Sequence, residues 1–401
     1  MNALADLLQR PPAEQVGRGY AHTAREIEQQ PDTWLETARA AVKAGPVLRE
    51  LLRAADVRPG GAGLIVLTGS GSSLYVAECA ARSLQQALRT TVRAVSSGQL
   101  LTHLDGCIAP DRPGVCVSLA RSGDSPESAA VVDQVLAERP AVRHLIVTCN
   151  GAGRLATRHA GRAGTVRLIL AERTCDRSLV MTSSFTNLLV ATHVLASLDD
   201  PRSYLDRVER IAGAARHVLA HSAVLATAAG RAYRSAMFLG SGNRLGAARE
   251  AALKMVEMTA GGVAATADTF LGLRHGPMSG VHADTLVVCL LASDPVTRSY
   301  ELDLVRELNR KQLGTRLIIG DRVPDDVVRE GDVVLDCRGL AQAGDDLATL
   351  TDVMAGQLLA LFRCLRAGLR PDAPSADNVI NRVVEDFTLY ARHALQPDAG
   401  A

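Results

Sequence analysis

Short apolar runs alternate with helical stretches along the first half of this chain. The apolar runs cover residues 64–68, 91–95, 115–119, 145–148 and 166–170, and helical segments are expected near 73–88, 125–138, 152–160 and 180–197. Short runs that are apolar throughout, separated by helices, are typical of a parallel sheet that is covered on both faces. The pattern therefore predicts an α/β fold. Upstream, Thr33 or Asp32 is expected to cap a helix that carries Trp34 inward.

The second half of the chain repeats this pattern. The strand-like sequence at 237–242 resembles that at 66–71, and 286–293 resembles 115–122, each 171 positions later. A third pair, 317–319 and 145–147, is 172 positions apart. Similar strands in the same order at nearly constant spacing indicate an internal duplication. We predict a helical segment over 1–35, a first domain over 36–201 and a second over 202–401, with the boundary near Asp199-Asp200-Pro201.

Composition narrows the class of protein. The 401 residues are 47% hydrophobic and 22% charged, as in soluble proteins of about two domains. A net charge of +1 and 3% aromatic residues argue against a nucleic-acid partner and against recruitment to acidic membranes. Eight scattered cysteines without a C-x-x-C pair indicate reduced thiols and no metal site. Because no signal peptide or apolar run of 18 residues is present, we expect a cytoplasmic protein.

Two serine-rich turns follow predicted strands, where ligands bind in folds of this kind. Gly69–Ser73 follows the first strand and Ala120–Ser128 the third. Glycines, hydroxyls and helix N-termini in such turns favour binding of a phosphate. Each serine also has a structural alternative, since Ser125 fits the N-cap of a helix that starts at Pro126. Neither a P-loop nor a dinucleotide fingerprint is present, so no cofactor is expected.

The second half lacks these serines and carries ionisable residues instead. Glu250, Lys254 and Glu257 occur at i, i+4 and i+7, on one face of a predicted helix. A carboxylate beside an ammonium can act as a general base, but the same spacing also fits an ordinary surface ion pair. Lys254 is one of only three lysines. His275 lies in a Gly/Pro-rich loop, where a histidine is commonly structural.

The serine turns resemble those of the sugar isomerase (SIS) domain family, phosphosugar-binding modules of flavodoxin-like topology. The resemblance spans both halves and implies tandem three-layer α/β/α domains. It also implies that Ser70, Ser72, Ser73, Ser122 and Ser125 hold the substrate phosphate. Ala120 replaces a phosphate-contacting serine of related aminosugar synthases, and Arg121 is expected to substitute for that contact.

The run E-x-A-L-K-x-x-E, followed by R-H-G-P, is similar to the isomerase half of glucosamine-6-phosphate synthase. This resemblance implies that Glu257 is the base that moves a proton between C2 and C1 of the sugar. It further implies that His275 opens the sugar ring from a partner subunit and that Lys254 assists electrostatically. The expected assembly is a homodimer or higher homo-oligomer with shared active sites.

Five stretches look like a narrower group, the AgaS-type tagatose-6-phosphate ketose/aldose isomerases, which include galactosamine-6-phosphate deaminases. They are 23–31, 119–128, 179–188, 270–277 and 381–390. The implied reaction converts galactosamine 6-phosphate to tagatose 6-phosphate and ammonia, although isomerase and deaminase would need the same residues. Segment 372–387 departs from the group's pattern, which leaves the substrate preference open. A non-catalytic sugar-phosphate sensor, and an etherase or epimerase, are the alternatives.

Overall fold

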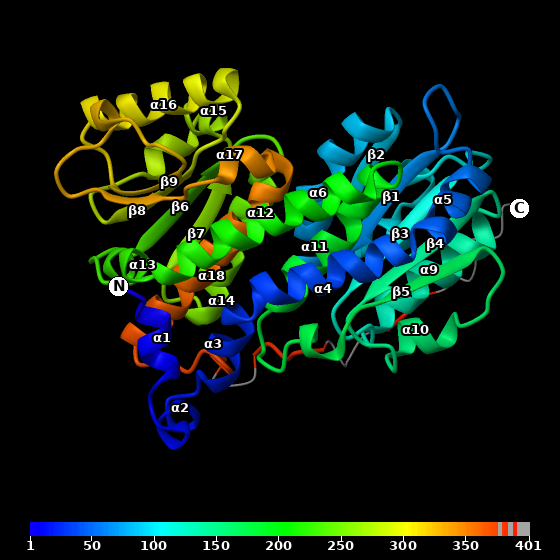
Figure 1. Cartoon of the computed structure of the whole chain (residues 1–401), viewed down its shortest axis with the longest axis horizontal. Coiled ribbons are helices and arrows are strands. Elements are labelled where there is room, and N and C mark those ends of the chain that lie inside the picture. Colours follow the sequence, from blue (N-terminus) through cyan, green and yellow to red (C-terminus); the bar gives the residue numbers. More distant parts are fainter. Residues whose placement is uncertain (376–378, 384–387, 391–401) are drawn as a thin grey trace, which may run out of the picture.

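The computed structural model describes residues 1–375, 379–383 and 388–390 and contains two five-stranded parallel sheets (Figure 1). Part of the divergent segment 372–387 therefore lies outside the described residues. The first sheet has the order β2-β1-β3-β4-β5 and the second β10-β9-β8-β6-β7. Their strands are β1 (Leu64–Gly69), β2 (Thr91–Ser96), β3 (Gly114–Ala120), β4 (Val142–Thr148), β5 (Thr165–Ile169), β6 (Ser235–Gly240), β7 (Ala264–Asp268), β8 (Thr285–Leu290), β9 (Thr315–Gly320) and β10 (Val333–Asp336).

The two sheets share one strand order, because β6 to β10 repeat the arrangement of β1 to β5. This is the flavodoxin-like order 2-1-3-4-5. The α/β fold class and the repetition predicted from the sequence are both confirmed. The sequence pattern found β6, β8 and β9, whose residues are almost entirely buried, but it missed the edge strands β7 and β10. Both edge strands are partly exposed and therefore lack a continuous apolar run.

Helices cover both faces of each sheet. In the first domain, α6 (Ser72–Leu88) and α11 (Ser183–His193) lie on the face toward the second domain, the inner face. Helices α7 (Ser97–Thr102) and α9 (Pro126–Glu138) share a separate core with the outer face. In the second domain, α14 (Arg244–Met258) and α18 (Asp345–Arg366) are the inner helices, and α15 (Phe270–Leu273) and α16 (Pro295–Arg310) the outer ones. One hydrophobic core contains the inner helices of both domains.

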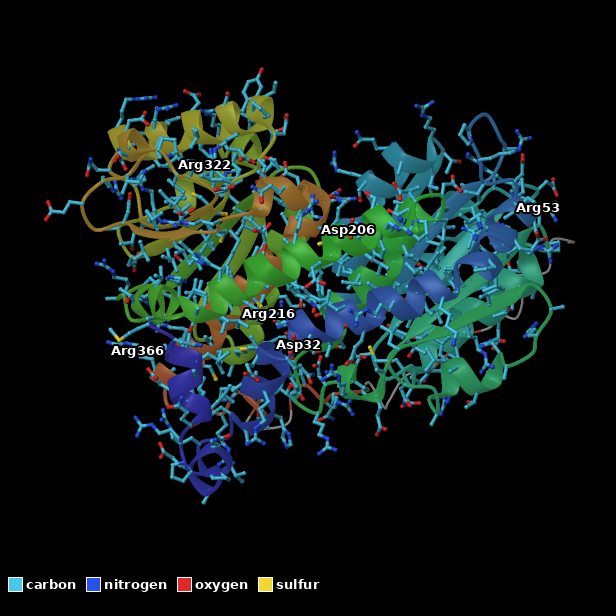
Figure 2. The ribbon with its side chains drawn as sticks, in the orientation of Figure 1. Asp32, Arg53, Asp206, Arg216, Arg322 and Arg366 are labelled. Carbon is cyan, nitrogen blue, oxygen red and sulfur yellow. The ribbon has the colours of Figure 1, made fainter. Side chains whose placement is uncertain are left out.

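The remaining helices complete the helical layers around the two sheets and connect the two domains. They are α1 (Ala3–Leu8), α2 (Pro12–Gly17), α3 (Ala21–Glu28), α4 (Gln30–Lys43), α5 (Gly45–Ala54), α8 (Leu104–Cys107), α10 (Arg154–Arg158), α12 (Pro201–Ala220), α13 (Ala223–Ala229) and α17 (Leu340–Ala343). Helices α4 and α12 run side by side, and Arg216 of α12 pairs with Asp32 of α4 at 2.6 Å (Figure 2).

Helix α4 begins earlier than the sequence pattern predicted. Its first residue is Gln30, so Thr33 and Asp32 lie inside the helix and the predicted cap is wrong. Pro31 is tolerated in the first turn because that turn needs no backbone N–H there. Trp34 is fully buried, as expected, and its indole N–H donates to Thr186 Oγ1 at 2.8 Å. The helix continues across position 35, where the sequence pattern placed the start of the first domain. The predicted domain bounds stay predictions.

Helix α18 is the most apolar long helix. Among the described residues it alone has the length and hydropathy that could cross a membrane, but 94% of that window is buried inside the protein. It packs against α12, α13 and α14, and Gln357 near its middle accepts a hydrogen bond from Gln30 of α4 at 2.8 Å. We conclude that α18 is a core helix.

Candidate functional site

The two serine turns meet at the carboxyl edge of the first sheet. Strands β1 and β3 are hydrogen-bonded neighbours, so the turns that follow them lie next to each other. The Ser70 hydroxyl donates to the carboxylate of Glu127, which lies in the first turn of α9. Gly71 has φ 54°, a left-handed conformation that suits glycine and turns the chain into α6. The arrangement places the positive ends of α6 and α9 beside one another.

The serines of the two turns differ in what holds them. Ser72 and Ser73 are buried in the first turn of α6, whereas Ser122 Oγ accepts the backbone N–H of Asp124 at 3.3 Å. Ser125 occupies the N-cap position of α9, but its side chain makes no capping hydrogen bond. Helix capping therefore does not account for this serine, and its role in binding phosphate stays a prediction.

Arg121 lies beneath the second turn and faces away from solvent. Only 8% of it is exposed, and its guanidinium donates to the carbonyls of Leu179 at 2.9 Å and Arg382 at 2.8 Å. These bonds fix the loop before α11 against the edge of the sheet. The expected phosphate contact of Arg121 stays a prediction.

The loop before α11 is also anchored by two buried carboxylates. Asp176 accepts backbone N–H bonds from Thr182, Ser183 and Ser184 at 2.8–3.0 Å and so caps α11. Glu26 of α3 accepts the N–H of Arg177, and burial together with the charge of Asp176 raises the pKa of Glu26 to about 7. The anchored loop places Met181 Sδ 3.9 Å from the hydroxyl of Ser73.

Helix α14 brings its ionisable residues from the second domain to the first serine turn. Lys254 Nζ donates to Ser72 Oγ at 3.1 Å, lies 3.3 Å from Glu250 Oε1 and pairs with the Glu257 carboxylate. The close approach of α14 to α6 depends on Gly246, because a Cβ there would lie 2.7 Å from the Cys79 backbone nitrogen. We call Ser72, Glu250, Lys254 and Glu257 the junction cluster.

Burial governs the charges of the junction cluster. Glu250 and Lys254 are fully buried, while 21% of the Glu257 side chain is exposed. Burial raises the pKa of Glu250 to about 8, against the opposing charge of Lys254. Burial also acts to lower the pKa of Lys254, but the two carboxylates outweigh it and raise that pKa. At neutral pH the cluster thus combines a protonated Glu250, an ammonium, and one carboxylate that reaches solvent.

The structure does not bring His275 to the junction cluster within one chain. His275 is exposed and follows α15, whose Phe270 and Leu273 pack on the outer face of the second sheet. Helix α14 covers the inner face of the same sheet. Among the described residues, no hydrogen bond or ion pair joins the His275 side chain to the cluster.

Sequence reasoning did not select Glu250 as a site residue. Its spacing from Lys254 and Glu257 was the available signal, but that spacing fits an exposed ion pair equally well. Only the packing of α14 on α6 shows that this helix face is buried against Ser72. In the part of the chain that the structure describes, no group of three or more His, Cys, Asp or Glu side chains could hold a metal ion.

Known proteins resemble this chain along most of its length. No family model matches the chain. The "Putative D-galactosamine-6-phosphate deaminase AgaS" of Streptomyces coelicolor is 38% identical over 388 residues, which cover 94% of this chain and 97% of that protein. The D-galactosamine-6-phosphate deaminase AgaS of Escherichia coli is 33% identical, covering 92% and 95%. A solved structure described as a "putative tagatose-6-phosphate ketose/aldose isomerase" from Clostridium novyi superposes with a TM-score of 0.88 at 29% identity, covering 94% and 97%.

Proposed function

The chain belongs to the AgaS-type family of SIS-domain proteins, the galactosamine-6-phosphate deaminases and tagatose-6-phosphate isomerases, and we propose below which residues bind the substrate and transfer the proton. It is an enzyme that acts on an amino-sugar phosphate. We propose galactosamine 6-phosphate as the substrate, with tagatose 6-phosphate and ammonia as the products. Its cellular location would be cytoplasmic, in keeping with α18 as a core helix.

The observation that carries the assignment of residues is the junction cluster. It joins the phosphate-binding type of turn in one domain to an acid–base pair in the other through the Lys254–Ser72 hydrogen bond. We propose that Ser70, Ser72, Ser73, Ser122 and Ser125, beside the two helix N-termini, hold the phosphate. Anchoring the phosphate there would place the other end of the sugar beside α14, at a fixed distance from its carboxylates.

Proton transfer would then fall to Glu257, the carboxylate of the cluster that reaches solvent. It removes the proton from C2 of the open-chain aldehyde; the electron pair forms a C1=C2 double bond while the C1 oxygen takes up a proton, which gives an enolamine from the amino sugar or an enediol from the plain sugar. The same carboxyl returns the proton to C1. For the amino sugar this yields a ketimine, which water hydrolyses to the ketose and ammonia.

Lys254 would stabilise the negative charge that develops on the substrate oxygen during this transfer. Its ammonium is already held by the Glu250 and Glu257 side chains and the Ser72 hydroxyl, so little reorganisation is needed. Both carboxyl groups raise the pKa of Lys254, which keeps it an ammonium.

Ring opening requires an acid–base group beside the ring oxygen, and we propose His275 of a second chain for it. The exposed position of His275 on the outer face of the second sheet is suited to contact another copy. On this proposal the minimum active unit is a homodimer.

The test uses the purified chain with galactosamine 6-phosphate, glucosamine 6-phosphate and tagatose 6-phosphate, measuring ammonia release and aldose–ketose exchange. Glu257→Gln should lower kcat at least 10³-fold while substrate binding changes little, because only the proton transfer is removed. Glu78→Gln is the matched control, since Glu78 pairs with Arg249 outside the cluster. Wild-type turnover by Glu257→Gln would show that another residue is the base.

A further inference from the structure

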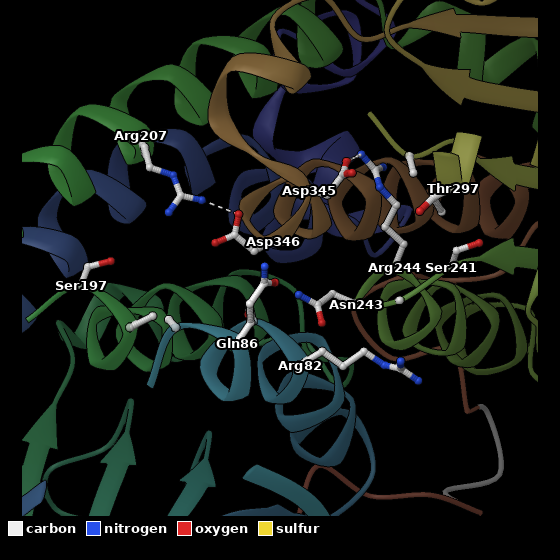
Figure 3. A pocket seen from close by; sticks show the side chains of 15 residues that line it. Arg82, Gln86, Ser197, Arg207, Ser241, Asn243, Arg244, Thr297, Asp345 and Asp346 are labelled. Atoms are coloured by element: carbon white, nitrogen blue, oxygen red, sulfur yellow. Dashed lines mark hydrogen bonds and ion pairs between the residues drawn. The ribbon is translucent and has the colours of Figure 1, made fainter. Parts of the chain in front are cut away.

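The structure contains a second pocket of about 610 Å³ at the carboxyl edge of the second sheet (Figure 3). Its walls come from the turn after β6, the start of α18 and the last half of α6. The residues that line it include Ser83, Gln86, Asn243, Arg244 and Asp345. The proposed catalytic residues of α14, by contrast, face the serine turn that follows β1 of the first sheet.

This pocket is the duplicate of the proposed catalytic site. Asn243 lies 171 positions after Ser72, in the same strand-to-helix turn, and Gly242 has φ 60° where Gly71 has 54°. Ser83 and Gln86 of α6 lie 171 positions before Lys254 and Glu257 of α14. Each pocket therefore combines the turn of one domain with the opposing helix of the other domain. In the second pocket, Ser83 and Gln86 cannot exchange protons as Lys254 and Glu257 can.

The phosphate position of this second pocket is filled by the chain itself. Ser293 and Asp294 follow β8 as Ser122 and Gly123 follow β3. Their backbone N–H groups donate to the Asp345 carboxylate at 2.8 and 3.0 Å, and Arg244 donates to the same carboxylate at 2.9 Å. Asp345 thus supplies the negative charge that a bound phosphate would bring to such a turn.

The remainder of the pocket carries polar groups that lack partners. Asn243 Oδ1 and Arg244 Nε are buried without a hydrogen bond, and the Arg244 side chain is only 1% exposed. Buried polar atoms of this kind are nearly always paired in folded proteins. Asn243 Oδ1 is an acceptor and Arg244 Nε a donor, and the hydroxyl groups of one ligand can satisfy both together.

We propose that this pocket binds an unphosphorylated six-carbon sugar without turning it over. The duplicated architecture supplies a sugar-sized site, and Asp345 excludes the phosphorylated form by occupying the anion position. Ser83 and Gln86 offer hydrogen bonds in place of acid–base chemistry. The pocket would let the enzyme sense the free sugar while the first site processes its phosphate ester.

Calorimetry with free galactose and galactosamine tests the pocket directly. The Glu257→Gln chain, saturated with galactosamine 6-phosphate at its first site, should still bind one free sugar per chain. Asn243→Ala combined with Gln86→Ala should weaken that binding at least tenfold and leave phosphosugar binding unchanged. Absence of free-sugar binding at millimolar concentration, or its loss when the first site is saturated, would overturn the proposal. Titration of free sugar into the wild-type chain without phosphosugar tests the pocket independently of whether Glu257 is the base.

The proposal that the Asp345 carboxylate occupies the phosphate position can be tested separately. Asp345→Ser should free the Ser293 and Asp294 N–H groups and add one inorganic phosphate site per chain, whereas Asp346→Asn, which disturbs only the neighbouring pair with Arg207, should not. Wild type should bind one phosphosugar per chain, a measurement that needs no substitution. Two phosphosugars per wild-type chain, or a folded Asp345→Ser chain with no added phosphate site, would contradict the proposal.

Discussion

Glu250 is the residue whose environment departs furthest from what its sequence position indicates. It is fully buried beside Lys254, and burial raises its pKa to about 8. Below that pH Glu250 is neutral, so the Lys254 ammonium interacts mainly with the Glu257 carboxylate and the substrate. Above it, a second carboxylate competes for the same ammonium and repels the charge that develops on the substrate. The acid–base function of the cluster thus depends on a carboxyl group that stays protonated.

We therefore expect kcat/KM of the wild-type enzyme to fall as the pH rises through about 8, because Glu250 ionises there. Glu250→Gln, which stays neutral, should remove this basic limb while the acidic limb persists. The measurement is a pH profile of ammonia release at low substrate concentration. Glu301→Gln is the matched control, because burial raises the pKa of Glu301 to about 7 on the outer side of the second sheet. An unchanged basic limb in Glu250→Gln would disprove the assignment.

A substitution at Ser125 can distinguish a role in ligand binding from a role in helix capping. Because this side chain makes no capping hydrogen bond, Ser125→Ala should raise KM roughly tenfold, the loss of about one hydrogen bond to a charged group, with little change in Tm. Asp200→Ala makes the converse control, since Asp200 caps α12 through the Ser203 N–H at 3.0 Å. That variant should lose about 1 kcal/mol of stability at unchanged KM. A Ser125→Ala chain with lowered Tm and normal KM would return Ser125 to a structural role.

At the scale of elements, the sequence pattern identified all five strands of the first sheet, edges β2 and β5 included, but in the second sheet it missed the edge strands β7 and β10. Buried strands such as β1, β3 and β8 are apolar along their whole length, so their positions are visible from composition alone. Edge strands depend on backbone pairing with a neighbour, which leaves a weaker trace in the side chains. The start of α4 was misjudged because capping residues inside a helix resemble those at its end.

The contact between α6 and α14 should be sensitive to the smallest added side chain. Gly246→Ala would place a Cβ 2.7 Å from the Cys79 backbone nitrogen and push the helices apart. We expect lower Tm together with a loss of activity, because the Lys254–Ser72 bond spans this contact. Gly213→Ala in α12 has no atom within 4 Å of its new Cβ and should be neutral or stabilising by roughly 0.5–1 kcal/mol. Thermal unfolding and turnover of the two variants would show whether the close approach matters.

At the scale of the whole molecule, the sequence indicated two domains and the residues of each half, but not how the halves meet. The junction cluster exists only because α14 of one domain packs on α6 of the other, and no local pattern encodes that contact. The role of Asp345 was equally hidden, since its partners Ser293 and Arg244 lie about 50 and 100 positions away. Neither interaction could be predicted from spacing.

The proposed homodimer predicts complementation between inactive chains. Glu257→Gln and His275→Ala should each be inactive alone, and mixing them with subunit exchange should restore about a quarter of wild-type activity if each site takes one residue from each chain. The mixture should be assayed for ammonia release after brief exposure to mild denaturant. A mixture that forms mixed dimers yet stays inactive would place His275 outside the shared site.

The reciprocal contact of α6 and α14 has a consequence for how such a chain came to exist. Each helix completes the pocket of the opposite domain, which is the isologous relation found in two-fold symmetric dimers. The single chain therefore has the architecture of two identical subunits joined end to end. Identical subunits must alter both pockets with every substitution, whereas a fused pair can change one and retain the other. Linkage of the halves thus permits one pocket to bind without turnover, as we propose, while its twin carries out the reaction.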